Sequence, residues 1–98
     1  MRVIWAPRAI DRAAEIAASI AADRPKSARD WIDGLFADVA SLAAHPRRGR
    51  VVPELNRPEV REVIYKAYRV IYRVDPKRLV VLTVRHGRRQ WDAAEVDG

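Results

Sequence analysis

The sequence predicts an α+β fold, in which an N-terminal strand precedes a two-helix antiparallel hairpin and an antiparallel sheet of three to four strands. Two patterns lead to this prediction. Apolar residues recur every three or four positions through residues 8–44, and they alternate or run continuously through residues 60–84. Prolines and glycines separate these segments. The chain has 98 residues, and we expect residues 1–98 to form one domain.

The first half is predicted to contain one strand and two helices. Residues 2–5 (RVIW) form a short apolar run typical of a strand. Helical spacing covers residues 8–23, where the apolar stripe is mostly alanine, and then residues 25–45. Pro25 breaks the first helix and suits the first turn of the second, so the two should pack as an antiparallel hairpin. Gly34 weakens the second helix by about 1 kcal/mol unless close packing compensates.

The second half is predicted to be a loop followed by three strands. Residues 46–58 contain three prolines, a glycine and an asparagine, which indicates a loop. Residues 60–66 are β-prone, and residues 68–74 (YRVIYRV) alternate clearly between two faces. Residues 79–84 (LVVLTV) are almost all apolar, as in a central strand that is buried on both faces.

The register of the last two strands decides which side chains meet. We expect the turn after Val74 to pair that residue with Leu79. Counting from this pair places His86 opposite Ala67, on the sheet face of Arg69 that points away from the helices.

Charge is distributed unevenly along the chain, whose net charge is +6. Residues 1–44 contain six basic and six acidic side chains, whereas residues 45–98 contain thirteen and seven. The basic half should therefore face an anionic partner or be masked by an acidic one. The alternative is that the excess Lys and Arg only keep a small protein soluble.

A cluster of arginines is the main candidate for binding chemistry. Each guanidinium offers a planar fork of donors that suits phosphate. Alternatively, these side chains are solvated charges on a sheet face or edge. The candidates for binding a target or nucleic acid are Arg69, Arg73, Arg85, Arg88, Arg89 and Trp91.

Two further residues have alternative interpretations. His86 follows the last strand, where neighbouring arginines would lower its pKa and suit a general base. Alternatively, His86 is a turn residue next to Gly87. Trp91 stands in a polar tail, where it would stack on a base or anchor a partner, or fold back onto the sheet.

Several function classes are excluded by missing residues and motifs. The chain has no cysteine, so it forms no disulfide or thiolate metal site. It lacks a glycine-rich phosphate loop, a dinucleotide fingerprint and metal-ligand spacing, so we expect no cofactor and no metal. No apolar run is long enough for a signal peptide or a membrane span, and we expect a cytoplasmic protein.

Four strings together resemble the RelE/ParE superfamily of toxins. They are WAPRAIDRAAEIAASIA, HPRRGRVVPEL, REVIYKAYRVIYRV and LVVLTVRHGRR, in the family's order over nearly the whole chain. The resemblance implies a helical hairpin on a twisted antiparallel sheet. It also implies a cognate antitoxin, whose acidic or amphipathic segment wraps the toxin and complements its basic half.

The superfamily has two functional branches, and the first cleaves mRNA in the ribosome. By this resemblance Arg69 and Arg89 would stabilise charge on the reacting phosphate, and Arg61 or Lys66 would supply a further cation. The C-terminal tyrosine base of that branch is missing, because no tyrosine follows Tyr72, unless His86 replaces it.

The second branch, ParE-like, inhibits DNA gyrase without an enzymatic reaction, and we favour it. The alanine-rich hairpin and the H-G-R-R end resemble this branch at least as closely. A third hypothesis is a non-toxic binding module that acts as a corepressor and reaches operator DNA only through its antitoxin.

Overall fold

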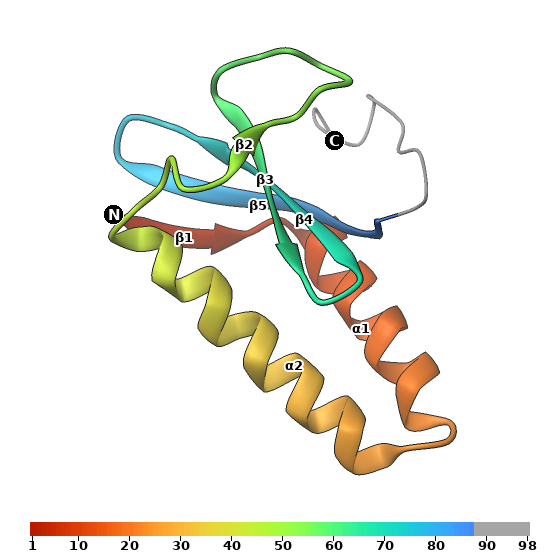
Figure 1. Ribbon diagram of the computed structural model, residues 1–98. Coiled ribbons are helices and arrows are strands. Elements are labelled where there is room, and N and C mark those ends of the chain that lie inside the picture. The colour runs from red at the N-terminus through yellow and green to blue at the C-terminus, as the bar shows by residue number, and fades with distance from the viewer. Residues whose placement is uncertain (88–98) are drawn as a thin grey trace.

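The computed structural model describes residues 1–87 as two helices packed against one sheet (Figure 1). The elements in chain order are β1 (Arg2–Trp5), α1 (Pro7–Ala21), α2 (Pro25–Ala40), the 3-10 helix η1 (Ser41–Ala43), β2 (Arg50–Val51), β3 (Val60–Tyr65), β4 (Tyr68–Val74) and β5 (Arg78–His86). This architecture confirms the predicted α+β class. Among the described residues, no helix is long and apolar enough to cross a lipid bilayer.

The sheet is larger than predicted, and it is mixed. Its five strands follow the order β1-β5-β4-β3-β2, and β1 runs parallel to β5, with Val3 beside Leu79. The other pairs are antiparallel. A parallel pair needs a long crossover, and the helical hairpin together with the following strands supplies it. The expectation of a wholly antiparallel sheet of three to four strands is corrected in these two respects.

A β-bulge changes the predicted register. Val74 pairs with Leu79 as expected, but Tyr72 pairs with Val81 while Ile71 pairs with Thr83. Leu82 is therefore an extra residue on β5, which is the definition of a bulge. Beyond it each pair is displaced by one residue.

The displaced register moves His86 to the other sheet face. His86 pairs with Tyr68 instead of Ala67, and Arg69 pairs with Arg85. Because directly paired residues point to the same face, His86 lies on the face of Tyr68 and away from Arg69. The expectation that His86 and Arg69 share a face is therefore wrong.

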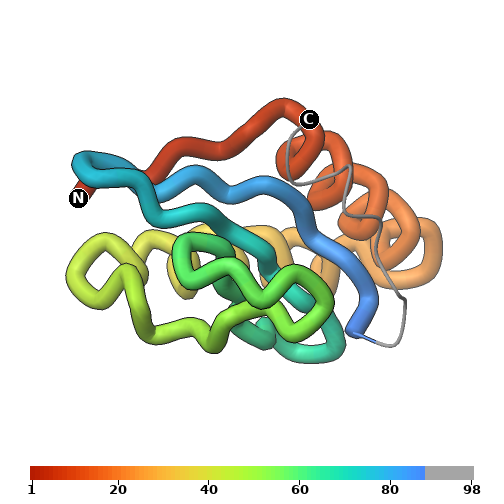
Figure 2. Tube along the Cα trace, turned by 90° about the horizontal axis from the view of Figure 1, so that it is seen from above, coloured from red at the N-terminus to blue at the C-terminus, as the bar shows by residue number. Residues whose placement is uncertain are grey.

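The main core lies between the helices and one face of the sheet (Figure 2). Ala9 and Ala13 of α1 are almost fully buried, and their small side chains let this helix approach the sheet closely. Trp31 and Leu35 of α2 fill the space beside them. The α-helix α2 ends earlier than residue 45, at Ala40, and η1 continues the chain with a tighter turn.

Gly34 allows a strand to lie close to α2. Tyr65 of β3 crosses the helix at this point, and its hydroxyl donates a hydrogen bond of 2.9 Å to the carbonyl of Trp31. A Cβ on Gly34 would collide with that hydroxyl. The glycine therefore weakens the helix but makes this contact possible.

The opposite sheet face carries a second, smaller core. Val80 and Leu82 of β5 pack there with Ile71, while alternate residues of β5 face the helices. The prediction of a strand buried on both faces is confirmed. The loop after β2 covers part of this second face through Val52 and Leu55.

Candidate functional site

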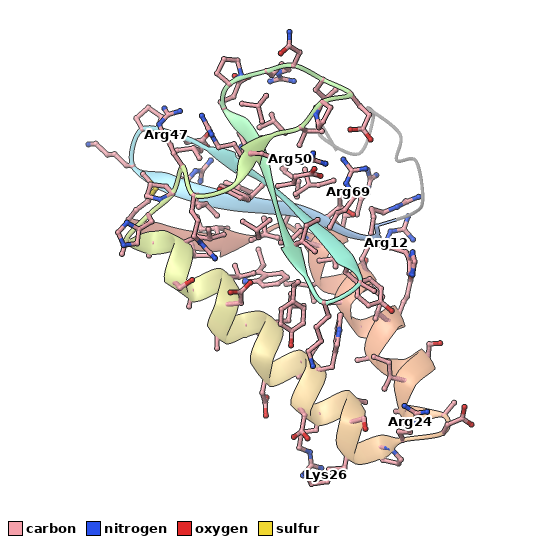
Figure 3. All side chains as sticks on the ribbon, in the orientation of Figure 1. Arg12, Arg24, Lys26, Arg47, Arg50 and Arg69 are labelled. Carbon is pink, nitrogen blue, oxygen red and sulfur yellow. The ribbon has the colours of Figure 1, made fainter. Side chains whose placement is uncertain are left out.

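Arg69 is buried and is held by two carboxylates. Its side chain lies on the sheet face away from the helices (Figure 3), and the residue is 6% exposed. Both terminal nitrogens donate to Glu54, at 2.8 Å and 2.9 Å, and Nε donates to Glu62. The hydrogen bond to Glu54 contributes most to raising the pKa of the guanidinium. All three nitrogens of Arg69 are thus engaged within the chain.

Glu62 connects three strands through two arginines. It is 1% exposed and receives the Nε donor of Arg50 from β2 as well as that of Arg69 from β4. Arg50, Glu54, Glu62 and Arg69 form a set with no net charge, which we call the arginine–glutamate network. Burying the Glu62 carboxylate is tolerable because both of its oxygens accept charge-assisted hydrogen bonds.

Glu54 brings the covering loop into this network. Hydrogen bonding to Arg69 is the main reason that the pKa of its carboxyl is lowered. Sequence reasoning missed Glu54, although it is an isolated acid in the basic string HPRRGRVVPEL. The signal is weak, because only the folded loop brings Glu54 to β4.

A second connection holds the loop before β2 through Tyr72. The buried hydroxyl of Tyr72 accepts a hydrogen bond from the N–H of Gly49 at 2.9 Å and donates one to the carbonyl of Pro46 at 2.7 Å. Burial raises the pKa of Tyr72. Arg61 completes the arrangement, since its NH1 donates to the Gly49 carbonyl at 2.9 Å.

Arg73 belongs to a local turn and not to the arginine–glutamate network. Strand alternation places it on the face of Arg69, as predicted, but its Nε donates to Asp75 at 2.8 Å. Arg78 shares the same carboxylate. This arginine therefore stabilises the β4–β5 turn.

His86 lies in a cleft on the helix side of the sheet. Its ring stands edge to face with that of Tyr68, with 5.5 Å between ring centroids. The cleft has a volume of about 370 Å³, and α1 contributes Arg12 and Ser19 to its wall. His86 and Arg69 are therefore on opposite sides of the sheet, and the structure does not assemble them into one site.

Three candidates cannot be placed against this geometry. Arg88, Arg89 and Trp91 lie outside the described residues. Within residues 1–87 no three acidic, histidine or cysteine side chains gather as metal ligands would.

Comparison with known proteins assigns the family. The model of the ParE toxin of the type II toxin–antitoxin system parDE matches residues 3–91. The chain belongs to the ParE toxin family. Membership confirms the RelE/ParE resemblance and identifies the chain as a type II toxin with ParE-like character.

Solved structures show the same fold at low sequence identity. A chain of the chromosomal ParDE system from P. aeruginosa is 19% identical with a TM-score of 0.75, covering 88% of this chain and 95% of the other. A chain of the RelBE2 toxin–antitoxin complex from Mycobacterium tuberculosis is 20% identical with a TM-score of 0.57, covering 87% and 95%. No curated protein was found to match this ParE-family chain.

The strings that carry the family resemblance contact one another in this ParE-family toxin. The string HPRRGRVVPEL supplies Pro46, Gly49 and Arg50, and the string REVIYKAYRVIYRV supplies Arg69 and Tyr72. Tyr72 binds the backbone of the first string, and Glu62 joins the two arginines. At these positions the motifs therefore hold the loop against the sheet.

Proposed function

We propose that this ParE-family toxin arrests growth by inhibiting DNA gyrase and that a cognate antitoxin neutralises it in the cytoplasm. The observation that carries the proposal is the engagement of Arg69 by two carboxylates. An arginine that stabilises a reacting phosphate must direct donors at that phosphate. In this toxin those donors are directed at Glu54 and Glu62.

Among residues 1–87, the groups around Arg69 supply no strong base for RNA cleavage. His86 is on the other side of the sheet, and the Glu54 carboxyl has a lowered pKa, which makes it a weak proton acceptor. Inhibition of a topoisomerase needs no proton transfer by the toxin. These features favour gyrase inhibition over cleavage of mRNA.

Partnership with an antitoxin is supported by the structural neighbours, both of which come from toxin–antitoxin systems. The net charge of +6 favours an acidic segment in that antitoxin. Operator DNA would then be reached only through the antitoxin.

The test is a supercoiling assay with purified gyrase, toxin and relaxed plasmid, run beside primer extension on a translated mRNA after induction of the toxin alone. We expect loss of supercoiling, accumulation of cleaved plasmid and intact mRNA. Addition of the antitoxin should restore supercoiling. Cuts confined to translated codons, with gyrase unaffected, would overturn the proposal.

That opposite outcome would support the alternative, a RelE-like endoribonuclease. The likeness to a RelBE2 complex and the position of Arg69 on β4 keep this alternative open. If the induced protein neither arrests growth nor affects either target, the remaining candidate is a non-toxic corepressor of its antitoxin.

A further inference from the structure

We infer that the loop before β2 and the strands beside it present an anionic-ligand surface, which binds the phosphate backbone of duplex DNA. Four arginines of this region, Arg47, Arg48, Arg50 and Arg61, form what we call the basic corner. Arg50 also belongs to the arginine–glutamate network, through Glu62, whereas Arg47, Arg48 and Arg61 lie outside that network. The inference extends the proposed function, because the DNA would be the segment that gyrase holds.

The basic corner carries more positive charge than its carboxylates neutralise. Among residues 1–87, neither Arg47 nor Arg61 has a carboxylate partner. Arg61 donates only to the backbone carbonyls of Pro58 and Gly49, so its charge is not balanced by those bonds. The other two arginines are paired: Arg48 lies 3.6 Å from Asp38, and Arg50 binds Glu62.

The two nearby glutamates balance the charges of Arg50 and Arg69, and among the described residues they leave the positive charges of Arg47 and Arg61 without a counter-charge. Glu62 binds Arg50 through a single nitrogen and also binds Arg69, and Glu54 binds Arg69 with both oxygens. The Arg50 side chain stays 65% exposed. Only its Nε donates to Glu62, so the exposed side chain remains accessible to an external anion. Figure 3 shows Arg47 and Arg50 on the same side of the sheet, opposite the hairpin turn that carries Arg24.

The backbone of the basic corner is fixed in advance. Tyr72 binds Pro46 and Gly49, and a Cβ on Gly49 would lie 2.6 Å from the Tyr72 hydroxyl and 2.5 Å from the Glu62 carbonyl. The loop therefore cannot adjust much, and its arginines project from a rigid base. Fixing the loop before binding lowers the entropy cost of association.

The character of the surface favours nucleic acid over a protein segment. Protein interfaces centre on buried apolar and aromatic side chains, with charges at the rim. The large hydrophobic side chains exposed among residues 1–87 are Met1, Ile10, Phe36 and Ile64, none of which comes from residues 46–61. The apolar residues beside Arg47 and Arg48 are the small Ala44 and Pro46. Guanidinium groups in such surroundings suit phosphates, which bind mainly through charge and hydrogen bonds.

The test is fluorescence anisotropy of a labelled short DNA duplex titrated with the full-length toxin over a series of salt concentrations, without gyrase. The double variant Arg47→Gln/Arg61→Gln is compared with Arg24→Gln/Arg29→Gln, which removes the same charge from the exposed hairpin turn and α2. We expect the corner variant to bind more weakly and to reduce the slope of log K against log salt by about two, roughly one for each lost phosphate contact. The hairpin variant should keep the wild-type slope.

Equal losses in both variants would mean that only net charge matters, and would overturn the inference. So would an unchanged slope in the corner variant, or binding of poly-glutamate without binding of the duplex. Because Arg61→Gln removes a backbone contact, Arg47→Gln alone and Arg61→Lys serve as second variants. Arg47→Gln should lower the slope of log K against log salt by about one, and Arg61→Lys should keep the wild-type slope.

This titration and the supercoiling assay together separate the two proposals. A toxin that binds duplex DNA through the basic corner but leaves gyrase active would refute gyrase inhibition and retain the inference. A toxin that inhibits gyrase, but whose corner variant binds duplex DNA as tightly as the wild type, would refute the inference and retain gyrase inhibition.

Discussion

The hydroxyl of Tyr72 lies 2.9 Å from the backbone nitrogen of Gly49, and this hydrogen bond joins two residues that are 23 positions apart in sequence. A substitution at Tyr72 would remove hydrogen bonds, and a substitution at Gly49 would cause a steric clash. Tyr72 is fully buried, and its hydroxyl both accepts from Gly49 and donates to Pro46. Gly49 has backbone and side-chain atoms where a Cβ would stand. The contact therefore explains why a glycine and a tyrosine are needed at these positions.

Removing the Tyr72 hydroxyl should destabilise the fold. In Tyr72→Phe the buried N–H of Gly49 loses its partner, and an unsatisfied buried group costs about 1–3 kcal/mol. Urea unfolding monitored by circular dichroism would measure the loss. Tyr65→Phe is the matched control, because it removes a single hydrogen bond from a half-buried hydroxyl and should cost less. Equal stability of Tyr72→Phe and wild type would contradict this account.

Breaking the arginine–glutamate network should cost more. Arg69→Met leaves the Glu62 carboxylate buried with one partner, and removing half of a buried ion pair typically costs about 3–5 kcal/mol. The double variant Arg69→Met/Glu62→Leu should recover part of that loss, because no buried charge is left unpaired. Arg50 and Glu54 also lose a partner, but their side chains are accessible to water. Thermal unfolding of both variants would show whether the double variant is more stable than the single variant. A double variant less stable than the single would contradict it.

This stability effect limits what toxicity assays can show. A non-toxic Arg69→Ala variant would be expected from unfolding alone, whatever the target. Toxicity of such variants is therefore informative only when their unfolding midpoints have been measured.

The helices and strands of the fold were predictable because their patterns are local. Alanine spacing marked α1, and the alternation of residues 68–74 marked β4 with its two faces. The parallel pairing of β1 with β5 was not predictable from these patterns, since it joins the two ends of the described chain. Pairing between distant segments leaves no periodic signal in either one.

The candidate site was predicted less well, for two physical reasons. The bulge at Leu82 adds one residue to β5, and a slip of one residue moves every later side chain to the other face, including His86. The partners of Arg69 also come from elsewhere, with Glu54 in a loop and Glu62 on β3. The strand pattern showed where Arg69 points but not which charges it meets.

The stability of the toxin should fall in mild acid through Glu54. The pKa of its carboxyl is lowered in the folded state from an ordinary value of 4.5, so its contribution is present above that value and is lost as the pH falls through the folded pKa. Urea unfolding between pH 7 and pH 3 should therefore show a decline that is shallower in Glu54→Gln. Glu59→Gln is the control, because that carboxylate is solvated and its lowered pKa, set mainly by a backbone hydrogen bond, is screened. A decline of the same steepness in Glu54→Gln and wild type would rule out this role.

The contact between Gly34 and Tyr65 should make two substitutions interdependent. Alanine favours a helix over glycine by about 1 kcal/mol, yet Gly34→Ala should destabilise the toxin, because its methyl group meets the Tyr65 hydroxyl. In the Tyr65→Phe background the hydroxyl is gone, so the same substitution should be neutral or stabilising. A double-mutant cycle by urea unfolding would measure this coupling, which should exceed about 0.5 kcal/mol for residues in direct contact. Additive effects would mean that β3 moves away from α2 at little cost, and that Gly34 is not required for their close approach.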